Sequence, residues 1–139
     1  MFGRDTHILL VDDSIHMRRL IADTLYQLGF RSLVSCSDAN EALRALMTSV
    51  KSSKKFDLIL SDLNMPGPSG LDFLKQVRNS DSFKQIPFIL ITTESEKGCV
   101  LEAAQNGVSS YIVKPFTSGT LAERLMQAYK KHYPDSKAS

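Results

Sequence analysis

The sequence lacks the features that define several large classes of protein. Its two cysteines, Cys36 and Cys99, lie far apart and in different predicted elements, so they form no disulfide framework, and no cysteine–histidine spacing resembles a zinc site. No apolar stretch approaches the length of a membrane span, and the first residues lack the apolar core of a signal peptide. A Gly-x-x-x-x-Gly-Lys-Ser/Thr motif is missing, which excludes a P-loop nucleotide triphosphatase. We therefore expect a reduced, cytoplasmic protein without membrane contact.

A large excess of charge of one sign is also lacking. The net charge is +2, and no long basic run is present. Lys51, Lys54 and Lys55 lie among serines without interleaved aromatic residues, so a solvated loop is favoured over contact with nucleic acid. With 139 residues, 42% apolar and 23% charged, the composition is typical of one globular domain. We expect a monomer in which residues 1–133 form the domain and residues 134–139 a polar tail.

Short apolar runs predict the strands. Residues 7–11, 56–61, 87–91 and 110–113 show little polar alternation, which is typical of strands buried on both faces of a parallel sheet. Residues 31–36 supply a fifth strand.

Five segments of helical period alternate with these strands. The first spans residues 15–28 and ends at Gly29, and the second opens at a capping-box sequence, Asp38 to Glu41. The other three cover residues 70–78, residues 96–106 before Gly107, and a segment capped by Thr117 or Ser118 and stopped by Pro134. The alternation predicts a doubly wound α/β fold with right-handed crossovers, but it does not choose between the two common strand orders.

Charged and hydroxyl side chains follow four of the strands. Asp12 and Asp13 follow the first strand, Asp62 the third, Thr92 the fourth and Lys114 the fifth. Ligands of open parallel sheets bind beyond the carboxyl ends of the strands. In the order 2-1-3-4-5, the first and third strands are neighbours about 4.8 Å apart. In that order the three aspartates can share one cation, with the lysine and the threonine within reach.

Three neighbouring carboxylates need a positive charge between them. At an effective dielectric constant near 20, each pair repels by about 4 kcal/mol. Hard oxygen ligands with positions left for water and phosphate suit Mg²⁺ better than zinc. A phosphoryl group there would meet the metal, the Lys114 ammonium and the Thr92 hydroxyl together, as phosphoryl transfer requires. The alternative, that Asp12 and Asp13 only cap the following helix, needs one acid and leaves the other unexplained.

Four motifs at these strand ends resemble those of the receiver domain of two-component response regulators. They are Val-Asp-Asp-Ser at 11–14, Ser-Asp-Leu-Asn-Met-Pro-Gly-Pro-Ser-Gly at 61–70, Thr-Thr-Glu at 92–94 and Tyr-Ile-Val-Lys-Pro-Phe at 111–116. The motifs match in order and in spacing, and the resemblance covers residues 6–132.

Further residues resemble the stand-alone chemotaxis regulators of that family. Asn64, Glu94, Met-Arg-Arg at 17–19 and Lys-Pro-Phe-Thr at 114–117 agree with them. The chain departs from them in a longer loop at residues 48–55 and in a C-terminal extension, and either departure could alter the choice of partner.

The resemblance implies a fold, a cofactor and a role for each site residue. The fold is a flavodoxin-like, doubly wound, five-stranded parallel sheet in the order 2-1-3-4-5 with five helices. Asp62 is the phosphoacceptor. Mg²⁺ is bound by Asp13, Asp62 and the backbone carbonyl of Asn64, with Asp12 acting mostly through water. Lys114 pairs with the phosphoryl oxygens.

The resemblance also implies how the signal leaves the site. Thr92 moves toward the phosphoryl group and Tyr111, otherwise an ordinary half-buried strand aromatic, turns inward. The peptide bond between Lys114 and Pro115 is expected to be cis. Asn64 and Glu94 flank the path of water to the phosphoryl group and tune dephosphorylation. The implied output face lies on the fourth helix, last strand and last helix, and its candidates are Lys97, Tyr111, Val113, Phe116 and Arg124.

The implied partners are a sensor histidine kinase, a flagellar motor switch protein and a phosphatase, and the chain itself is a switch rather than an enzyme. A relay of phosphate between histidine proteins, or a receiver excised from a hybrid kinase or transcriptional regulator, stays open. An aspartate-nucleophile phosphatase of the haloacid dehalogenase type is disfavoured, because its second acid would stand at Ser14.

The start of the fourth helix is predicted to be the softest element. It reads Ser-Glu-Lys-Gly at 95–98, and a glycine inside a helix costs about 1 kcal/mol relative to alanine. Such an element suits a switch, which needs two arrangements of similar energy.

Overall fold

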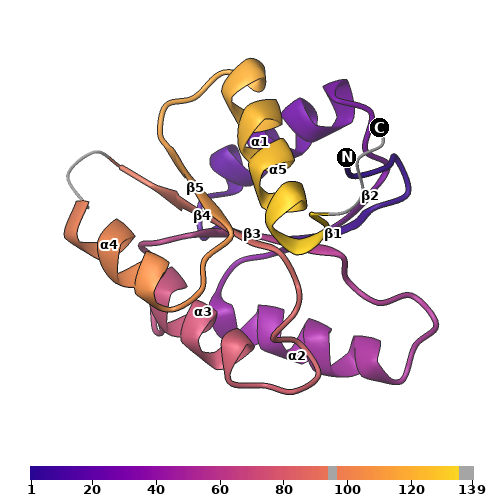
Figure 1. Ribbon diagram of the computed structural model, residues 1–139, viewed down its shortest axis with the longest axis vertical. Coiled ribbons are helices and arrows are strands. Elements are labelled where there is room, and N and C mark those ends of the chain that lie inside the picture. The colour runs from indigo at the N-terminus through magenta and orange to yellow at the C-terminus, as the bar shows by residue number, and fades with distance from the viewer. Residues whose placement is uncertain (94–96, 135–139) are drawn as a thin grey trace.

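The computed structural model describes residues 1–93 and 97–134, and its strands and helices alternate along the chain. The elements are β1 (His7–Val11), α1 (Ile15–Gln27), β2 (Ser32–Cys36), α2 (Ala39–Val50), β3 (Leu58–Asp62), α3 (Gly70–Arg78), β4 (Phe88–Thr92), α4 (Lys97–Gln105), β5 (Ser110–Val113) and α5 (Ser118–His132). The strands pair in parallel in the order β2-β1-β3-β4-β5 (Figure 1). The predicted fold and strand order are confirmed.

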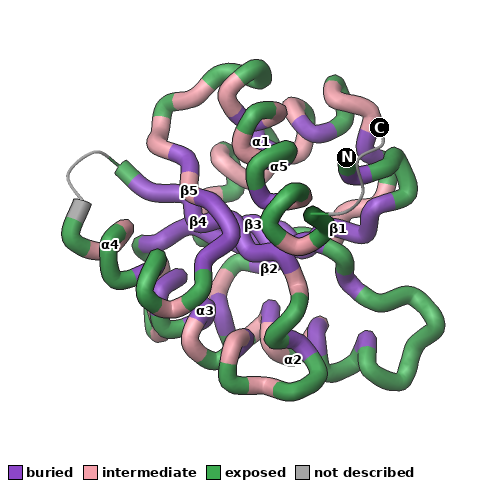
Figure 2. Tube along the Cα trace, viewed as in Figure 1, coloured by how far each residue is buried: buried purple, intermediate pink, exposed green. Residues whose placement is uncertain are grey.

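Helices cover both faces of the sheet. In Figure 1, α1 and α5 lie on one face and α2, α3 and α4 on the other. Successive strand residues point to opposite faces, so Leu9 and Phe88 belong to the cluster under α2 and α3, whereas Ile8 and Ile89 belong to the cluster under α1 and α5. Figure 2 shows the central strands β1, β3 and β4 as a buried layer between the helices, whereas the edge strands β2 and β5 are less buried. Two apolar cores therefore pack against the sheet, one on each face.

The helix ends explain the boundaries. Gly29 and Gly107 have φ values of 102° and 86°, a left-handed conformation that side chains other than glycine rarely adopt, and they end α1 and α4 as predicted. Ser14 caps α1 by accepting a hydrogen bond from the Met17 amide, so the alternative in which Asp12 or Asp13 caps this helix is wrong.

The predicted capping box of α2 forms only in part. Asp38 accepts from the Glu41 amide at 2.8 Å, but the Glu41 carboxylate accepts from the amide of Ser37 at 2.7 Å rather than from that of Asp38. The Ser37 hydroxyl donates to the same carboxylate oxygen. The two hydrogen bonds from Ser37 therefore draw the Glu41 side chain past Asp38. A complete box stands instead at the start of α3, between Ser69 and Asp72.

The other boundaries agree with the sequence. Thr117 caps α5 by accepting from the Thr120 amide at 3.1 Å. α4 is helical from Lys97, and the three residues before it, which carry part of its predicted soft start, lie outside the described residues. Within 1–93 and 97–134, none of the helices is long and apolar enough to cross a membrane.

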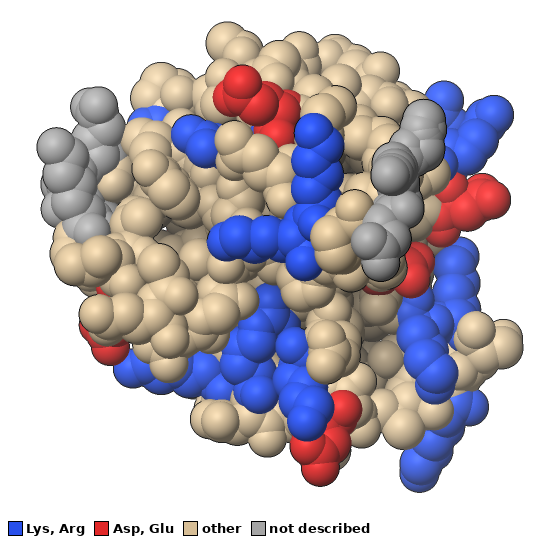
Figure 3. Space-filling model, viewed as in Figure 1, with Lys and Arg blue, Asp and Glu red and all other residues tan. Residues whose placement is uncertain are grey.

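Basic side chains gather on part of the surface. In Figure 3, lysine and arginine side chains form a band below α5 and a second group beside the loop that follows α2. Lys51, Lys54 and Lys55 are exposed, as expected for a solvated loop.

Candidate functional site

The three aspartates meet at the carboxyl ends of β1 and β3. Val11 pairs with Ser61, so Asp12 and Asp62 come next to each other where the two strands end. One oxygen from each of Asp12, Asp13 and Asp62 lies within 4.8 Å of the others. Asp12 and Asp62 are buried, whereas Asp13 is exposed at the mouth of the site. The sequence therefore predicted correctly that these three side chains come together.

Lys114 reaches this cluster from the end of β5. Its Nζ lies 3.0 Å from Asp62 Oδ1 and 3.4 Å from Asp12 Oδ2. Its amide donates to the carbonyl of Thr92 at 2.7 Å, which ties the end of β5 to the end of β4. The peptide bond between Lys114 and Pro115 is cis, as expected.

Every polar atom of Asp12 has a partner. The amide donates to the carbonyl of Cys36, and Oδ1 accepts from the amide of Ser14 at 2.9 Å. Its carbonyl accepts from Arg18 Nη1 at 2.7 Å. In the sequence Arg18 belongs to the Met-Arg-Arg motif, but nothing there predicts its link to Asp12, because a contact across the first turn of a helix has no signature in residue spacing.

Burial dominates the electrostatics of Asp62. Desolvation raises the pKa of this carboxyl above its ordinary value, the hydrogen bond from Lys114 opposes that rise, and the charge of Asp12 adds to it. One ammonium against three carboxylates leaves the cluster strongly negative. A hard divalent cation fits the donors, which are all carboxylate oxygens, and Mg²⁺ meets that description.

Glycine is required where α3 begins. Gly70 donates its amide to the carbonyl of Leu63 at 2.8 Å, and its α-carbon lies against the backbone of Asp62. A β-carbon at this position would collide with the Asp62 carbonyl oxygen. The sequence predicted Gly70 as a helix start and missed its role as a spacer behind the acidic residue.

Two further residues predicted for the site, Thr92 and Asn64, lie at the end of β4 and two residues beyond β3. Thr92 is 1% exposed, and its Oγ1 donates to the carbonyl of Thr93 at 3.2 Å. Asn64 is exposed two residues after Asp62. Glu94 lies outside the described residues.

Two predicted output residues are in direct contact. The Arg124 guanidinium lies 5.1 Å from the centre of the half-buried Tyr111 ring, a cation–π distance, and its Nη1 donates to Gln127 Oε1 at 3.1 Å. Phe116 packs instead with the cluster of α1 and α5, and Val113 is half-buried at the end of β5. Lys97 begins α4, and its side chain is not described.

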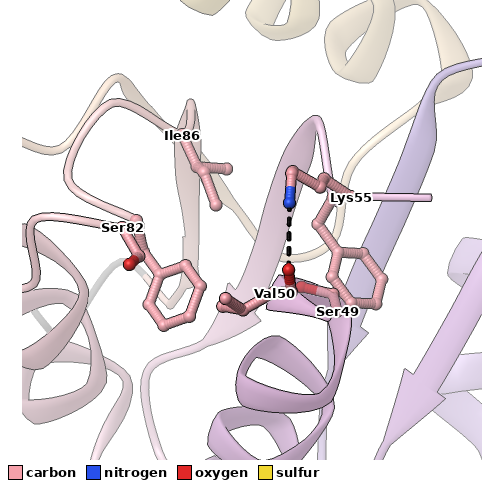
Figure 4. Close-up of a pocket in the computed structure, with 7 residues that line it drawn as sticks. Ser49, Val50, Lys55, Ser82 and Ile86 are labelled. Atoms are coloured by element: carbon pink, nitrogen blue, oxygen red, sulfur yellow. Dashed lines mark hydrogen bonds between the residues drawn. The ribbon is translucent and has the colours of Figure 1, made fainter. Parts of the chain in front are cut away.

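A separate pocket of about 290 Å³ lies at the opposite, amino end of the sheet (Figure 4). Its lining residues are Ser49, Val50, Lys55, Phe56, Ser82, Phe83 and Ile86. Lys55 Nζ donates to the Val50 carbonyl at 3.2 Å and so satisfies a carbonyl at the end of α2. None of the residues predicted for the site lines this pocket, so it is separate from the cluster of Asp12, Asp13 and Asp62.

A doubly wound sheet with three carboxylates clustered at one edge, in an arrangement that suits a cation, and a lysine facing them defines the class of phosphoacceptor receiver domains. Comparison with known proteins agrees, since the response regulator receiver domain family matches residues 8–126. The chain belongs to this family.

Several relatives cover nearly the whole chain. Chemotaxis protein CheY-3 of Vibrio cholerae is 39% identical over 131 residues, which are 94% of this chain and 97% of the relative. Chemotaxis protein CheY1 of Helicobacter pylori is 42% identical over 118 residues, or 85% of this chain and 92% of the relative.

Solved structures show the same fold. The chemotaxis response regulator CheY4 of Vibrio cholerae matches with a TM-score of 0.77 and 33% identity, over 89% of this chain and 98% of that one. The receiver domain of a sensor histidine kinase from Pseudomonas aeruginosa matches with a TM-score of 0.73 and 25% identity, over 88% of this chain and 96% of that one. That structure holds a magnesium ion in its active-site cleft. The chain is therefore a receiver domain of the CheY type.

Proposed function

We propose that Asp62 accepts a phosphoryl group from a sensor histidine kinase and thereby switches the chain for binding to a downstream target, the flagellar motor switch. The observation that carries the proposal is the buried Asp62 carboxylate, which pairs with Lys114 at 3.0 Å and shares a cluster with Asp12 and Asp13. The proposed domain is residues 1–133, with 134–139 as a tail, acting as a cytoplasmic monomer.

The geometry supports a direct displacement. Lys114 holds Asp62 Oδ1, so the second carboxylate oxygen attacks phosphorus while the bond from phosphorus to the kinase histidine breaks. Asp13, Asp62 and the Asn64 carbonyl would hold Mg²⁺, and Asp12 would contact it through water. When bound, the metal would neutralise charge on the phosphoryl oxygens. Lys114 then shifts its hydrogen bond from the carboxylate to a phosphoryl oxygen.

Thr92 and Tyr111 are proposed to carry the signal away from the site. The Thr92 hydroxyl is bonded only weakly, at 3.2 Å, to the neighbouring carbonyl of Thr93, so a phosphoryl oxygen can draw it over. Movement of Thr92 leaves space beside β4, and Tyr111 on the adjacent strand is proposed to turn into it.

The output face is proposed to follow that movement. Its residues, on the start of α4, on β5 and on α5, are Lys97, Tyr111, Val113, Phe116 and Arg124. Asn64 and Glu94 are proposed to set the rate of dephosphorylation by holding water beside the phosphoryl group, with a partner phosphatase adding to it. Replacing both with bulkier apolar residues should lengthen the phosphorylated lifetime.

The test is incubation with acetyl phosphate with and without Mg²⁺, followed by intact-protein mass spectrometry. We expect modification that depends on the metal and is lost in Asp62→Asn. Asp23→Asn is the matched control, because Asp23 is an exposed aspartate on α1. Modification that survives in Asp62→Asn would place the acceptor elsewhere.

A second measurement addresses the target. A peptide from a flagellar motor switch protein should bind the phosphorylated protein more tightly than the unmodified one. Equal binding of the two forms, together with transfer of the phosphoryl group to a histidine phosphotransfer protein, would support a relay instead.

A further inference from the structure

A partly buried polar cluster lies at the amino end of the sheet, opposite the aspartates. Ser109, just before β5, stands at its centre, and His132, the last residue of α5, has its Nε2 2.6 Å from Ser109 Oγ. The Phe88 amide donates to the same oxygen at 2.9 Å, and Arg78 Nη2 donates to it at 3.3 Å. The cluster therefore ties the end of α5 to β4 and to the end of α3.

Arg78 brings a positive charge into this cluster, and carbonyl groups hold it. Its Nε donates to Gly107 at 2.9 Å, and its Nη1 donates to Ile86 at 2.7 Å and to Lys84 at 3.2 Å. In the described part of the chain, Arg78 has no carboxylate within ion-pairing distance. Its charge is fixed in place and acts on its neighbours without a paired anion.

The hydrogen bonds at Ser109 Oγ determine the protonation state of His132. A hydroxyl has two lone pairs and one proton. The Phe88 amide and the Arg78 guanidinium can only donate, so they use the lone pairs and leave the hydroxyl proton for His132 Nε2. Nε2 must then be unprotonated, and His132 is neutral with its proton on Nδ1.

The surroundings of the ring favour the same state. Burial lowers the pKa of His132, the charge of Arg78 lowers it further and Lys131 adds to this, while a hydrogen bond with the Gln85 backbone opposes them. The Tyr133 ring lies 6.5 Å away. Both charged groups that act on the ring are cations, in keeping with the band of basic side chains below α5 in Figure 3.

We propose that Arg78, Ser109 and His132 form a proton-sensitive clamp, which holds the end of α5 on the sheet while His132 is neutral and releases it when Nε2 takes a proton. A protonated Nε2 would be a third donor to Ser109 Oγ and would leave the serine proton without an acceptor. The neutral ring contributes to the free energy of unfolding. This contribution is fully present above about pH 6.5, the ordinary pKa of histidine, and is lost as the pH falls toward the lowered pKa of His132 in the folded protein.

The clamp also bears on the output face, and this part rests on the proposed function. Ser110, next to the clamp, donates its hydroxyl to Gln127 Oε1 at 3.2 Å. The same oxygen accepts from Arg124, which lies over the Tyr111 ring. Release of the end of α5 therefore disturbs the contacts that position Tyr111.

Long-range ¹H–¹⁵N spectra of the imidazole rings of the full chain test the clamp directly. We expect His132 in the Nδ1–H form at neutral pH and a titration below pH 6.5. The Tyr133 amide donates to the Tyr129 carbonyl at 2.8 Å. Its protection against hydrogen exchange should fall in the same pH range, by up to about tenfold per pH unit, which is the limit when one proton is taken up. An Nε2–H form, or a titration at or above pH 6.5, would overturn the proposal.

Variants separate the clamp from general acid effects. His132→Gln should abolish the pH dependence of the Tyr133 protection and of the Tyr111 ring shifts. His16→Gln, at an exposed histidine on α1, should leave both unchanged. If His132→Gln does not fold, the tautomer and titration of the native protein still decide the matter. Neither readout uses phosphorylation, so the clamp can fail while the proposed function stands, and the reverse.

Discussion

At the scale of single residues, hydrogen bonds hold the carboxylates of the site in defined positions. Asp12 is held at its amide, its carbonyl and both carboxylate oxygens, and Asp62 is held at one oxygen by Lys114. Groups fixed in this way would lose little entropy in the proposed phosphoryl transfer, which is what catalysis by positioning requires. The cost is a buried carboxylate with a like charge beside it.

Replacing that carboxylate should therefore stabilise the metal-free protein. Asp62→Asn is expected to raise the free energy of unfolding by about 1 kcal/mol in the presence of a chelator. Because the pKa of Asp62 is raised in the folded state, its proton favours folding at low pH, and that stability is lost as the pH rises through the raised pKa.

Urea unfolding at several pH values measures the effect. The advantage of Asp62→Asn should grow from acid to neutral pH, and Asp23→Asn should show no such trend. A variant less stable than the native protein at neutral pH without metal would contradict this account of the site.

At the scale of elements, α3 and α4 differ in how firmly they are seated. α3 buries five residues and begins against the backbone of Asp62. Among the described side chains of α4, only Ala103 is buried, and Leu101 is 65% exposed. The sheet therefore holds one helix firmly beside Asp62 and leaves the other with little apolar contact, which fits the switch role proposed for α4.

The close approach of α3 can be tested at Gly70. Gly70→Ala should destabilise the protein by about 1–3 kcal/mol, because the added methyl group overlaps the Asp62 carbonyl and either α3 or the acid must move. Gly98→Ala in α4 is the control, since nothing lies within 4 Å of the added carbon. It should stabilise the helix by up to about 1 kcal/mol. Thermal unfolding of both variants is the measurement, and equal effects would refute the packing argument.

The weak seating of α4 should appear in hydrogen exchange. Amides in the first turn of α4 are expected to exchange faster than those in the interior of α1, which buries Ile21 and Leu25 fully. Gly98→Ala should slow the exchange in α4 and leave α1 unchanged. Protection in α4 equal to that in α1 would show that this helix is not the soft element.

At the scale of the whole molecule, binding at one edge stabilises the entire fold. The sheet joins both cores, so a cation bound only to the folded state favours the native form as a unit. Mg²⁺ at ten times its dissociation constant should raise the free energy of unfolding by about 1.4 kcal/mol.

Unfolding with increasing Mg²⁺ measures this linkage. Asp13→Asn should weaken it severalfold at least, because Asp13 is the exposed one of the three carboxylates proposed to hold the cation. Asp5→Asn, an exposed acid near the N-terminus, should retain it. Stabilisation of the native protein and of Asp13→Asn to the same extent would place the cation elsewhere.

Much of this protein follows from the sequence alone. Apolar runs without alternation determined the strands, helical period and glycine placement determined the helices, and the polar residues that end the runs determined which edge carries the site. These signals are local, because each depends on residues within a few positions of one another in the chain.

Only the tertiary structure decided the contacts between distant residues. The Arg18 contact with the Asp12 carbonyl, the need for glycine at position 70 and the cluster of Ser109 with His132 all depend on how packed elements meet. Local sequence cannot specify such contacts, because the distance between two side chains from different elements is set by the packing of both cores against one sheet.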